Sequence, residues 1–439
     1  MRLGRREVRA LAEALEAAER YKPFQVAKRK VMEKYGLAGS RVDRITTALL
    51  YKLYRMQGIL DQLASLAGLE HTRLPPLPRQ AVRLAVLLAV ADEVGDREFA
   101  DSLVKEFSRL VGARYGTGLG SAVERLYRSL LSQGIPPELR EQLRLMLPEI
   151  IIRRLRLLLP GSEIDEFAKA VNERRPWLGL RVNSLKATVD ELVREVEKYA
   201  TEVKLSRVPG HIRYRGSLPY SRFKPLLEGK AVPQDEASAA AGIILAPREG
   251  ETVVDLCAAP GGKTTHLAEL MKLRGRVVAM ELYADRMKRL VTLAVRTGTY
   301  TAIEPVLGNA LHASQLIHRP VDRVLLDPPC SSTGAIAKHP EARWRLTEEA
   351  LARLAERQWR MLQEALKLLP PGGRLLYTVC SVMPEEGEYL LQRLLETERV
   401  ELIPLGGPYD ESPLLPGTMR AWPHRHGVTG FFYALLEKR

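Results

Sequence analysis

The chain has 439 residues, of which 46% are hydrophobic, and it carries 67 Lys and Arg against 53 Asp and Glu. This composition excludes a disordered or collagen-like chain, and the length favours two or three domains because it exceeds what one core supports. The sequence holds no apolar run long enough to span a bilayer, and its amphipathic start carries several Glu, unlike a signal peptide. We therefore expect no membrane association and a cytoplasmic location.

The excess positive charge is concentrated in the first part of the chain. Residues 1–160 contain 28 Lys and Arg against 18 Asp and Glu. Their apolar residues recur at helical spacing in 42–68 and 77–94, with a proline-rich turn between them. This pattern predicts a helical bundle with a basic surface. Such a surface favours a polyanion partner such as RNA, and solvated charge that keeps the protein soluble is the alternative.

Residues 161–240 have a different character. A strand pattern at 178–183 is followed by an amphipathic helix at 187–200 and then by two short strand-like runs. We expect a small α+β module here. Five of its arginines could either face RNA or be solvated surface charges: Arg174, Arg175, Arg181, Arg213 and Arg215.

From residue 241 onward, strand and helix patterns alternate, which predicts a parallel sheet covered by helices on both faces. The expected strands are 252–257, 276–281, 303–308, 321–327 and 374–380, with a further strand at 430–438. The expected helices are 264–272, 284–297, 348–368 and 384–396. In such sheets, sites form at the carboxyl ends of the strands.

The first of these strands ends in the glycine turn CAAPGGKT at 257–264. A phosphate-binding loop would need glycine at position 257, where this chain has Cys257, so a nucleotide-dependent enzyme is the weaker alternative. Glu281 lies after the turn at the spacing expected of an acid that accepts hydrogen bonds from the two hydroxyl groups of a ribose. The free N–H groups of the next helix suit a carboxylate as well as a phosphate. S-adenosylmethionine has a ribose and a carboxylate but no phosphate, and it fits this turn best.

The chain has three cysteines, Cys257, Cys330 and Cys380, too few for a disulfide framework and without the spacing of a metal site. Cys330 and Cys380 each follow a strand that we expect to be adjacent, so both should point into one cleft. A permanent disulfide is disfavoured in the cytoplasm, and two sulfurs without further ligands make a poor metal site. Covalent catalysis remains, and no metal is expected.

A thiolate beside a methyl donor suits carbon 5 of cytosine, which is not nucleophilic enough by itself. Addition of the thiolate to carbon 6 makes carbon 5 nucleophilic; after methylation the carbon-5 proton leaves and the thiolate is eliminated. A carboxyl such as Asp327, with its pKa raised by burial, could hydrogen-bond N3 of the base. The base must reach such a cleft unstacked or flipped. The residues alone leave open whether Cys330 or Cys380 attacks.

Four motifs, CAAPGGKT, DPPCSSTG, TVCSVMPEEGE and TGFFYALLEK, resemble those of the RNA 5-methylcytosine methyltransferases of the bacterial Sun/Fmu (RsmB-like) and eukaryotic NSUN type. The segments RVNSLKAT (181–188) and PQDEAS (233–238) also fit, and the resemblance covers roughly residues 170–439. It implies that Cys380 is the nucleophile, that Cys330 helps to release the methylated RNA, and that Asp327 contacts the base.

The resemblance also implies a set of cofactor contacts, with Asn309 standing where the family usually has Asp. The set comprises Cys257, Ala258, Ala259, Pro260, Gly261, Gly262, Lys263, Glu281, Arg286, Asn309 and Asp327.

The same resemblance implies a domain order. We expect a NusB-like RNA-binding bundle (1–160), a small RRM-like RNA-binding module (161–240) and a Rossmann-like class I methyltransferase domain (241–439). It favours small-subunit ribosomal RNA as the substrate of a monomer, with transfer RNA as an alternative. A non-catalytic RNA-binding factor in ribosome assembly is the alternative of a different class.

Overall fold

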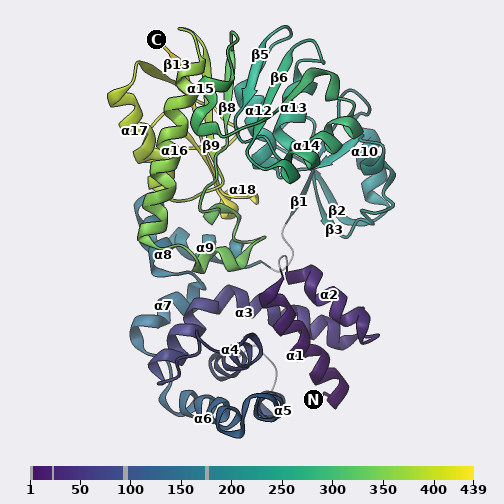
Figure 1. Ribbon diagram of the computed structural model, residues 1–439, viewed down its shortest axis with the longest axis vertical. Helices are drawn as coiled ribbons and strands as arrows, with labels where there is room; N and C mark the ends of the chain where they lie inside the picture. Colours follow the sequence, from purple (N-terminus) through teal and green to yellow (C-terminus); the bar gives the residue numbers. More distant parts are fainter. Residues whose placement is uncertain (1–2, 22–23, 92–96, 174–176) are drawn as a thin grey trace. The chain divides into compact units, whose positions relative to one another are not determined.

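The computed structural model describes residues 3–21, 24–91, 97–173 and 177–439 (Figure 1). The chain divides into two compact units, one formed by residues 1–149 with Arg343–Arg345 and the other by 150–342 with 346–439. Within the described ranges, no helix is both long and apolar enough to cross a membrane.

The first unit is helical, as its apolar periodicity predicts. Its helix α4 (Pro76–Val90) is buried on nearly all sides, because α1, α3, α5 and α6 pack around it. A helix that is apolar all round can only be stable in such a central place. The other helices of this unit are α1 (Arg5–Arg20), α2 (Phe24–Lys34), α3 (Arg41–Leu66), α5 (Arg97–Tyr115), α6 (Thr117–Gln133) and α7 (Pro137–Leu145).

The segment Arg343–Arg345 belongs to this unit because Trp344 packs into it. The indole Nε1 of Trp344 donates to the backbone carbonyls of Tyr54 and Arg55, each at 3.0 Å. The ring lies so close to Gly58 that a Cβ there would lie 2.3 Å from a ring carbon. Only glycine fits at position 58 while the indole occupies this place.

The second unit begins with α8 (Glu149–Leu158) and α9 (Gly161–Val171), followed by a four-stranded antiparallel sheet in the order β2-β3-β1-β4. Its inward-facing Leu180, Ile212 and Tyr214 pack against Leu192 and Val196 of the covering helix. The elements match the expected α+β pattern: β1 (Leu178–Val182), α10 (Val189–Glu197), β2 (Ala200–Leu205), β3 (His211–Gly216), α11 (Lys224–Leu227) and β4 (Ala231–Pro233).

The prediction that Arg181 could face RNA is wrong. Its side chain is 1% exposed and forms an ion pair with the carboxylate of Glu269, and its Nε donates to Oε1 of Gln234 at 2.7 Å. It lies on the face of β1 opposite Leu180, against α13, where a buried cation needs such partners. Arg215 is half-buried and pairs with Glu173 at 2.9 Å. Arg174 and Arg175 lie outside the described residues.

A nine-stranded sheet forms the centre of the rest of this unit. Its parallel strands, in spatial order, are β9 (Arg374–Val379), β8 (Arg323–Leu326), β5 (Thr252–Asp255), β6 (Arg276–Glu281) and β7 (Ile303–Leu307). The five expected strands are therefore confirmed to within two residues at each end. The helices that accompany them are α12 (Glu236–Leu245), α13 (Gly262–Leu270), α14 (Ala284–Thr297), α15 (Ala313–Leu316), α16 (Glu348–Leu368), α17 (Glu388–Thr397) and α18 (Pro423–His426).

The sheet is mixed, which corrects the expectation of a parallel sheet. The closing strand β13 (Phe431–Lys438) pairs antiparallel with β9, and β10 (Val400–Ile403) and β12 (Met419–Ala421) pair antiparallel with β13. The outermost strand is β11 (Asp410–Glu411). Short links such as the one between β12 and β13 lack the long crossover that parallel neighbours require.

Helices cover both faces of the sheet, as predicted (Figure 1). One core includes Leu267 of α13 and Leu290 of α14, and the other includes Trp359 of α16 and Leu391 of α17. The helix expected at 384–396 begins only at Glu388, because a 3-10 turn (Pro384–Glu386) and a glycine precede it. This early turn lies next to the site described below.

Candidate active site

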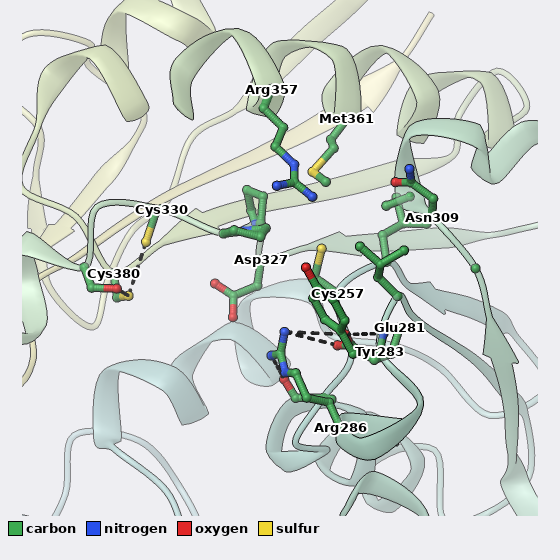
Figure 2. A pocket seen from close by; sticks show the side chains of 18 residues that line it. Cys257, Glu281, Tyr283, Arg286, Asn309, Asp327, Cys330, Arg357, Met361 and Cys380 are labelled. Carbon is green, nitrogen blue, oxygen red and sulfur yellow. Dashed lines mark hydrogen bonds and ion pairs between the residues drawn. The ribbon is translucent and has the colours of Figure 1, made fainter. Parts of the chain in front are cut away.

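A pocket lies where the parallel strands end (Figure 2). Strand β8 lies between β5 and β9, so the loops that follow these three strands converge on one place. Eight of the site residues expected from the sequence line the pocket: Cys257, Ala259, Glu281, Arg286, Asn309, Asp327, Cys330 and Cys380.

The glycine turn joins β5 to α13 and forms one wall of this region. Gly261 has φ +106°, and a Cβ there would lie 3.1 Å from the side chain of Leu290, so the turn needs glycine. Of the expected cofactor contacts in this turn, Cys257 and Ala259 line the pocket. Five others are outside its lining: Ala258, Pro260, Gly261, Gly262 and Lys263.

Asp255, a residue that the sequence reasoning passed over, is buried at the end of β5. Its Oδ2 accepts from Oγ1 of Thr264 at 2.8 Å. Burial raises the pKa of Asp255 to about 6, even though this hydrogen bond opposes the rise. The side chain therefore fastens the strand end to the first turn of α13.

The acid at the end of β6 is joined to the glycine turn by an arginine. The carboxylate of Glu281 is 3% exposed, and its Oε1 accepts from the backbone N of Tyr283 at 3.0 Å. Arg286 lies 3.4 Å from this carboxylate and donates from Nη2 to the carbonyl of Ala259 at 2.7 Å (Figure 2). Arg286 thus links the two strand ends that the sequence assigned to the cofactor.

Asn309 lies after β7 and also lines the pocket. Its Oδ1 accepts from the backbone N of Leu311 at 3.1 Å and so caps the turn that follows. An aspartate would accept the same bond, which explains how Asn can replace it without loss of the turn.

The two expected thiols meet in the pocket. The Sγ atoms of Cys330, after β8, and Cys380, after β9, lie 3.3 Å apart, and Sγ of Cys380 lies 3.7 Å from Oγ of Ser332 (Figure 2). The hydrogen bond from Cys330 lowers the pKa of the Cys380 thiol. The same bond, together with burial, raises the pKa of Cys330 well above its ordinary value. Cys380 is therefore the more acidic thiol of the pair, and Cys330 is held more firmly in its protonated form.

Lys263 and Asp327 form an ion pair beside the thiols, with 2.6 Å between Nζ and Oδ2. Burial opposes the charge on Lys263, but the carboxylate of Asp327 raises its pKa above the ordinary value. An ion pair favours the charged form of both partners. The pair therefore places the ammonium of Lys263 and the carboxyl group of Asp327 side by side, next to the two thiols.

Several lining residues were missed by the sequence reasoning. Arg357 and Met361 reach the pocket from α16, one turn apart, and Tyr283 follows Glu281 (Figure 2). Helical periodicity puts Arg357 and Met361 on one face, but it does not say which face meets the pocket. Within the part of the chain that the structure describes, no group of three or more His, Cys, Asp or Glu could hold a metal ion.

These features define a class of protein. The sheet is Rossmann-like, a glycine turn follows its first parallel strand, and an acid follows the second. The pocket has no phosphate loop. Together these features are those of a class I S-adenosylmethionine-dependent methyltransferase. Residues 242–437 match the family model described as 16S rRNA methyltransferase RsmB/F. The chain belongs to this family. This membership confirms three predictions: the family resemblance, S-adenosylmethionine as the cofactor, and the enzyme class of the RNA cytosine-5 methyltransferases.

Relatives support this assignment over most of the chain. A probable ribosomal RNA small subunit methyltransferase B of Synechocystis is 30% identical and covers 90% of this chain and 91% of its own length. A 28S rRNA (cytosine-C(5))-methyltransferase of mouse is 33% identical over 66% of this chain, which spans only 38% of that protein.

Two solved structures show the same fold. The structure titled PH0851 is 38% identical, with a TM-score of 0.85 and full coverage of both chains. A methyltransferase homologue from Pyrococcus horikoshii is 29% identical, with a TM-score of 0.60, and covers 70% of this chain and 100% of its own.

Proposed function

We propose that this protein methylates carbon 5 of cytosine in RNA through a covalent bond between Sγ of Cys380 and carbon 6 of the base. The observation that carries the proposal is the thiol pair: the sulfur atoms of Cys330 and Cys380 lie 3.3 Å apart and their pKa values shift in opposite directions. A thiolate with a neutral thiol beside it suits an addition followed by an elimination.

The addition begins when the electron pair of the Cys380 thiolate forms the bond to carbon 6. The electrons of the C5=C6 double bond move toward N3, where the ammonium of Lys263, paired with Asp327, is the nearby proton donor. Asp327 itself accepts from the exocyclic amino group of the base. A protonated Asp327 that donates to N3, as the sequence suggested, is the alternative.

Release requires the C5–H and S–C6 bonds to break. The proton leaves carbon 5 for a solvent water, its electron pair restores the C5=C6 double bond, and the S–C6 electron pair returns to Cys380. N3 gives its proton back to Lys263, which restores the neutral ring. Cys330 lies in van der Waals contact with the sulfur that must depart. We assign assistance of this elimination to Cys330.

The pocket residues fit S-adenosylmethionine, which supplies the methyl group as an activated sulfonium when it is bound. The buried carboxylate of Glu281 suits the ribose hydroxyls, and Asn309 suits the adenine edge. Arg286 holds Glu281 and the glycine turn in one arrangement. Lys263 is engaged with Asp327, so we assign it to the base and not to the cofactor.

We propose small-subunit ribosomal RNA as the substrate, since the matching family model and the Synechocystis relative are both named for it. Transfer RNA is the alternative. We further propose that the helical region 1–160 is NusB-like, that 161–240 is RRM-like, and that both bind RNA beside the methyltransferase domain 241–439. We expect a monomer that works in the cytoplasm.

The test is a methyl-transfer assay with labelled S-adenosylmethionine on transcribed small-subunit ribosomal RNA and on transfer RNA, followed by bisulfite mapping. We expect 5-methylcytosine in the ribosomal transcript and none with the Cys380→Ser variant. Product at another atom, or product formed by Cys380→Ser, would contradict the mechanism. Binding of RNA without any product on either transcript would favour the non-catalytic assembly factor.

A further inference from the structure

A buried carboxylate that no step above uses lies beside both cysteine-bearing loops. Glu386 is the last residue of the 3-10 turn Pro384–Glu386 and is 0% exposed. Within the described ranges, no Lys, Arg or His forms an ion pair with it. A charge buried in this way must be stabilised by several hydrogen-bond donors.

Four donors reach the two carboxylate oxygens of Glu386. Its Oε1 accepts from the backbone N of Ser331 and from Nε2 of Gln358, each at 2.9 Å. Its Oε2 accepts from Oγ of Ser331 and from Oγ of Ser381, each at 2.5 Å. One side chain thus binds two loops that are 50 residues apart in the sequence.

The positions of these donors connect Glu386 to the chemistry. Ser331 comes directly after Cys330, and Ser381 comes directly after Cys380. The carboxylate therefore fixes the neighbour of each sulfur-bearing residue, and any shift of one loop against the other would break a charge-assisted hydrogen bond.

Further bonds make this arrangement rigid. Nε2 of Gln358 also donates to the carbonyl of Pro329 at 2.9 Å, which holds the residue before Cys330. The hydroxyl of Tyr377 donates to the backbone carbonyl of Glu386 at 2.7 Å, and Oγ1 of Thr333 accepts from the backbone N of Val382 at 3.0 Å. A fully satisfied buried network of this kind allows one geometry.

The charge of Glu386 has a second effect. The hydrogen bond to Cys380 and burial are the main causes of the raised pKa of the Cys330 thiol, and the carboxylate of Glu386 adds to them. It helps to keep Cys330 protonated, and a protonated Cys330 donates to the Cys380 thiolate.

We propose that Glu386 is a positioning residue that fixes the loops of Cys330 and Cys380 against each other, so that both sulfur atoms reach one pyrimidine ring. The inference rests on the proposed function, since it needs both thiols to act on the same base. Displacement of reacting groups by about 1 Å can cost on the order of 100-fold in rate. The carboxylate is well suited to prevent such a displacement.

The first test needs no RNA. We would measure the pH dependence of Cys330 alkylation by iodoacetamide in a Cys380→Ser background, by peptide mass spectrometry. Glu386→Gln removes the charge and should lower the pH midpoint of Cys330 alkylation. Glu386→Asp keeps the charge and should leave this midpoint unchanged. Glu251→Gln is the matched control, because Glu251 bonds Arg323 at the opposite end of the sheet. An unshifted midpoint in Glu386→Gln would contradict the inferred effect of the Glu386 charge on the Cys330 thiol.

The second test is single-turnover methylation of the ribosomal transcript with Cys330 and Cys380 intact. Glu386→Gln and Glu386→Asp should each slow the reaction on the order of 100-fold without weakening S-adenosylmethionine or RNA binding, because only loop geometry changes. Glu251→Gln should react like the native protein. If the Glu386 variants fail to fold, Ser331→Ala and Ser381→Ala replace them, each with an expected loss of about tenfold.

Native rates in folded Glu386 variants, or in both serine variants, would overturn the proposal. The two proposals fail in different ways. If the native protein methylates no RNA but the alkylation midpoint still shifts in Glu386→Gln, the proposed function fails while the contact between Glu386 and the Cys330 loop stands. If the native protein is active and the variants match it, the inference about Glu386 alone fails.

Discussion

The sulfur of Cys330 lies 3.3 Å from the sulfur of Cys380, and this contact shifts the pKa values of the two thiols in opposite directions within one pocket. The hydrogen bond between them lowers the pKa of Cys380 and, together with burial, raises that of Cys330. This single contact makes two residues of the same type unequal in acidity.

Removal of Cys330 should leave the enzyme bound to its substrate. In Cys330→Ala the attack by Cys380 is still possible, but the elimination loses the group beside the departing sulfur. We expect a protein–RNA conjugate that survives denaturing gel electrophoresis in the presence of S-adenosylmethionine, and none with the Cys330→Ala, Cys380→Ser double variant. Full turnover by Cys330→Ala would contradict the role.

The reactivity of Cys380 should persist below the ordinary pKa of a thiol. A lowered pKa means that the thiolate is already present below the ordinary thiol value of about 8.5 and is lost only as the pH falls through the lowered value. Cys330→Ala removes the donor, so the pH midpoint for alkylation of Cys380 should rise. The midpoint can be read by iodoacetamide labelling, and a midpoint that stays in place would show that the contact does not set the pKa.

Loss of Lys263 should affect the base and spare the cofactor. Lys263→Met removes the ammonium that lies 2.6 Å from Asp327, and general acid catalysis of this kind contributes on the order of 100-fold or more. We expect single-turnover methylation to fall by that factor while calorimetry gives native affinity for S-adenosylmethionine. A large loss of cofactor affinity would instead support the contact that the family resemblance implies.

Asp255 should cost the protein stability at neutral pH. Its folded pKa of about 6 exceeds its unfolded value, so the stabilisation that it gives when neutral is present at acid pH and is lost as the pH rises from about 4 to 6. A shift of about two units corresponds to roughly 3 kcal/mol. Asp255→Asn keeps a hydrogen bond to Thr264 without the charge.

We therefore expect the midpoint temperature of thermal unfolding to be higher for Asp255→Asn than for the native protein at pH 8. The difference between the two midpoints should shrink below pH 5. Thr264→Val, which deletes only the hydroxyl partner, serves as the control and should lose stability at both values. An Asn variant that is less stable than the native protein at pH 8 would show that Asp255 is held as a charged group.

The sequence by itself determined the elements and the chemistry they carry. Period-3.6 patterning locates α16, which buries one face, and short apolar runs locate the five parallel strands, which are buried on both faces. The strand-then-motif order places Cys257, Asp327, Cys330 and Cys380 at one edge, since parallel strands share a carboxyl end.

Only the tertiary structure decided how these residues act on each other. The antiparallel place of β13, the inward turn of Arg181, the pairing of Lys263 with Asp327 and the bonds of Glu386 all depend on contacts between distant segments. No local pattern encodes such contacts, because hydrogen bonds and pKa values depend on what lies across the fold. Two cysteines that are alike in sequence thus come to differ in acidity only when β8 and β9 lie side by side.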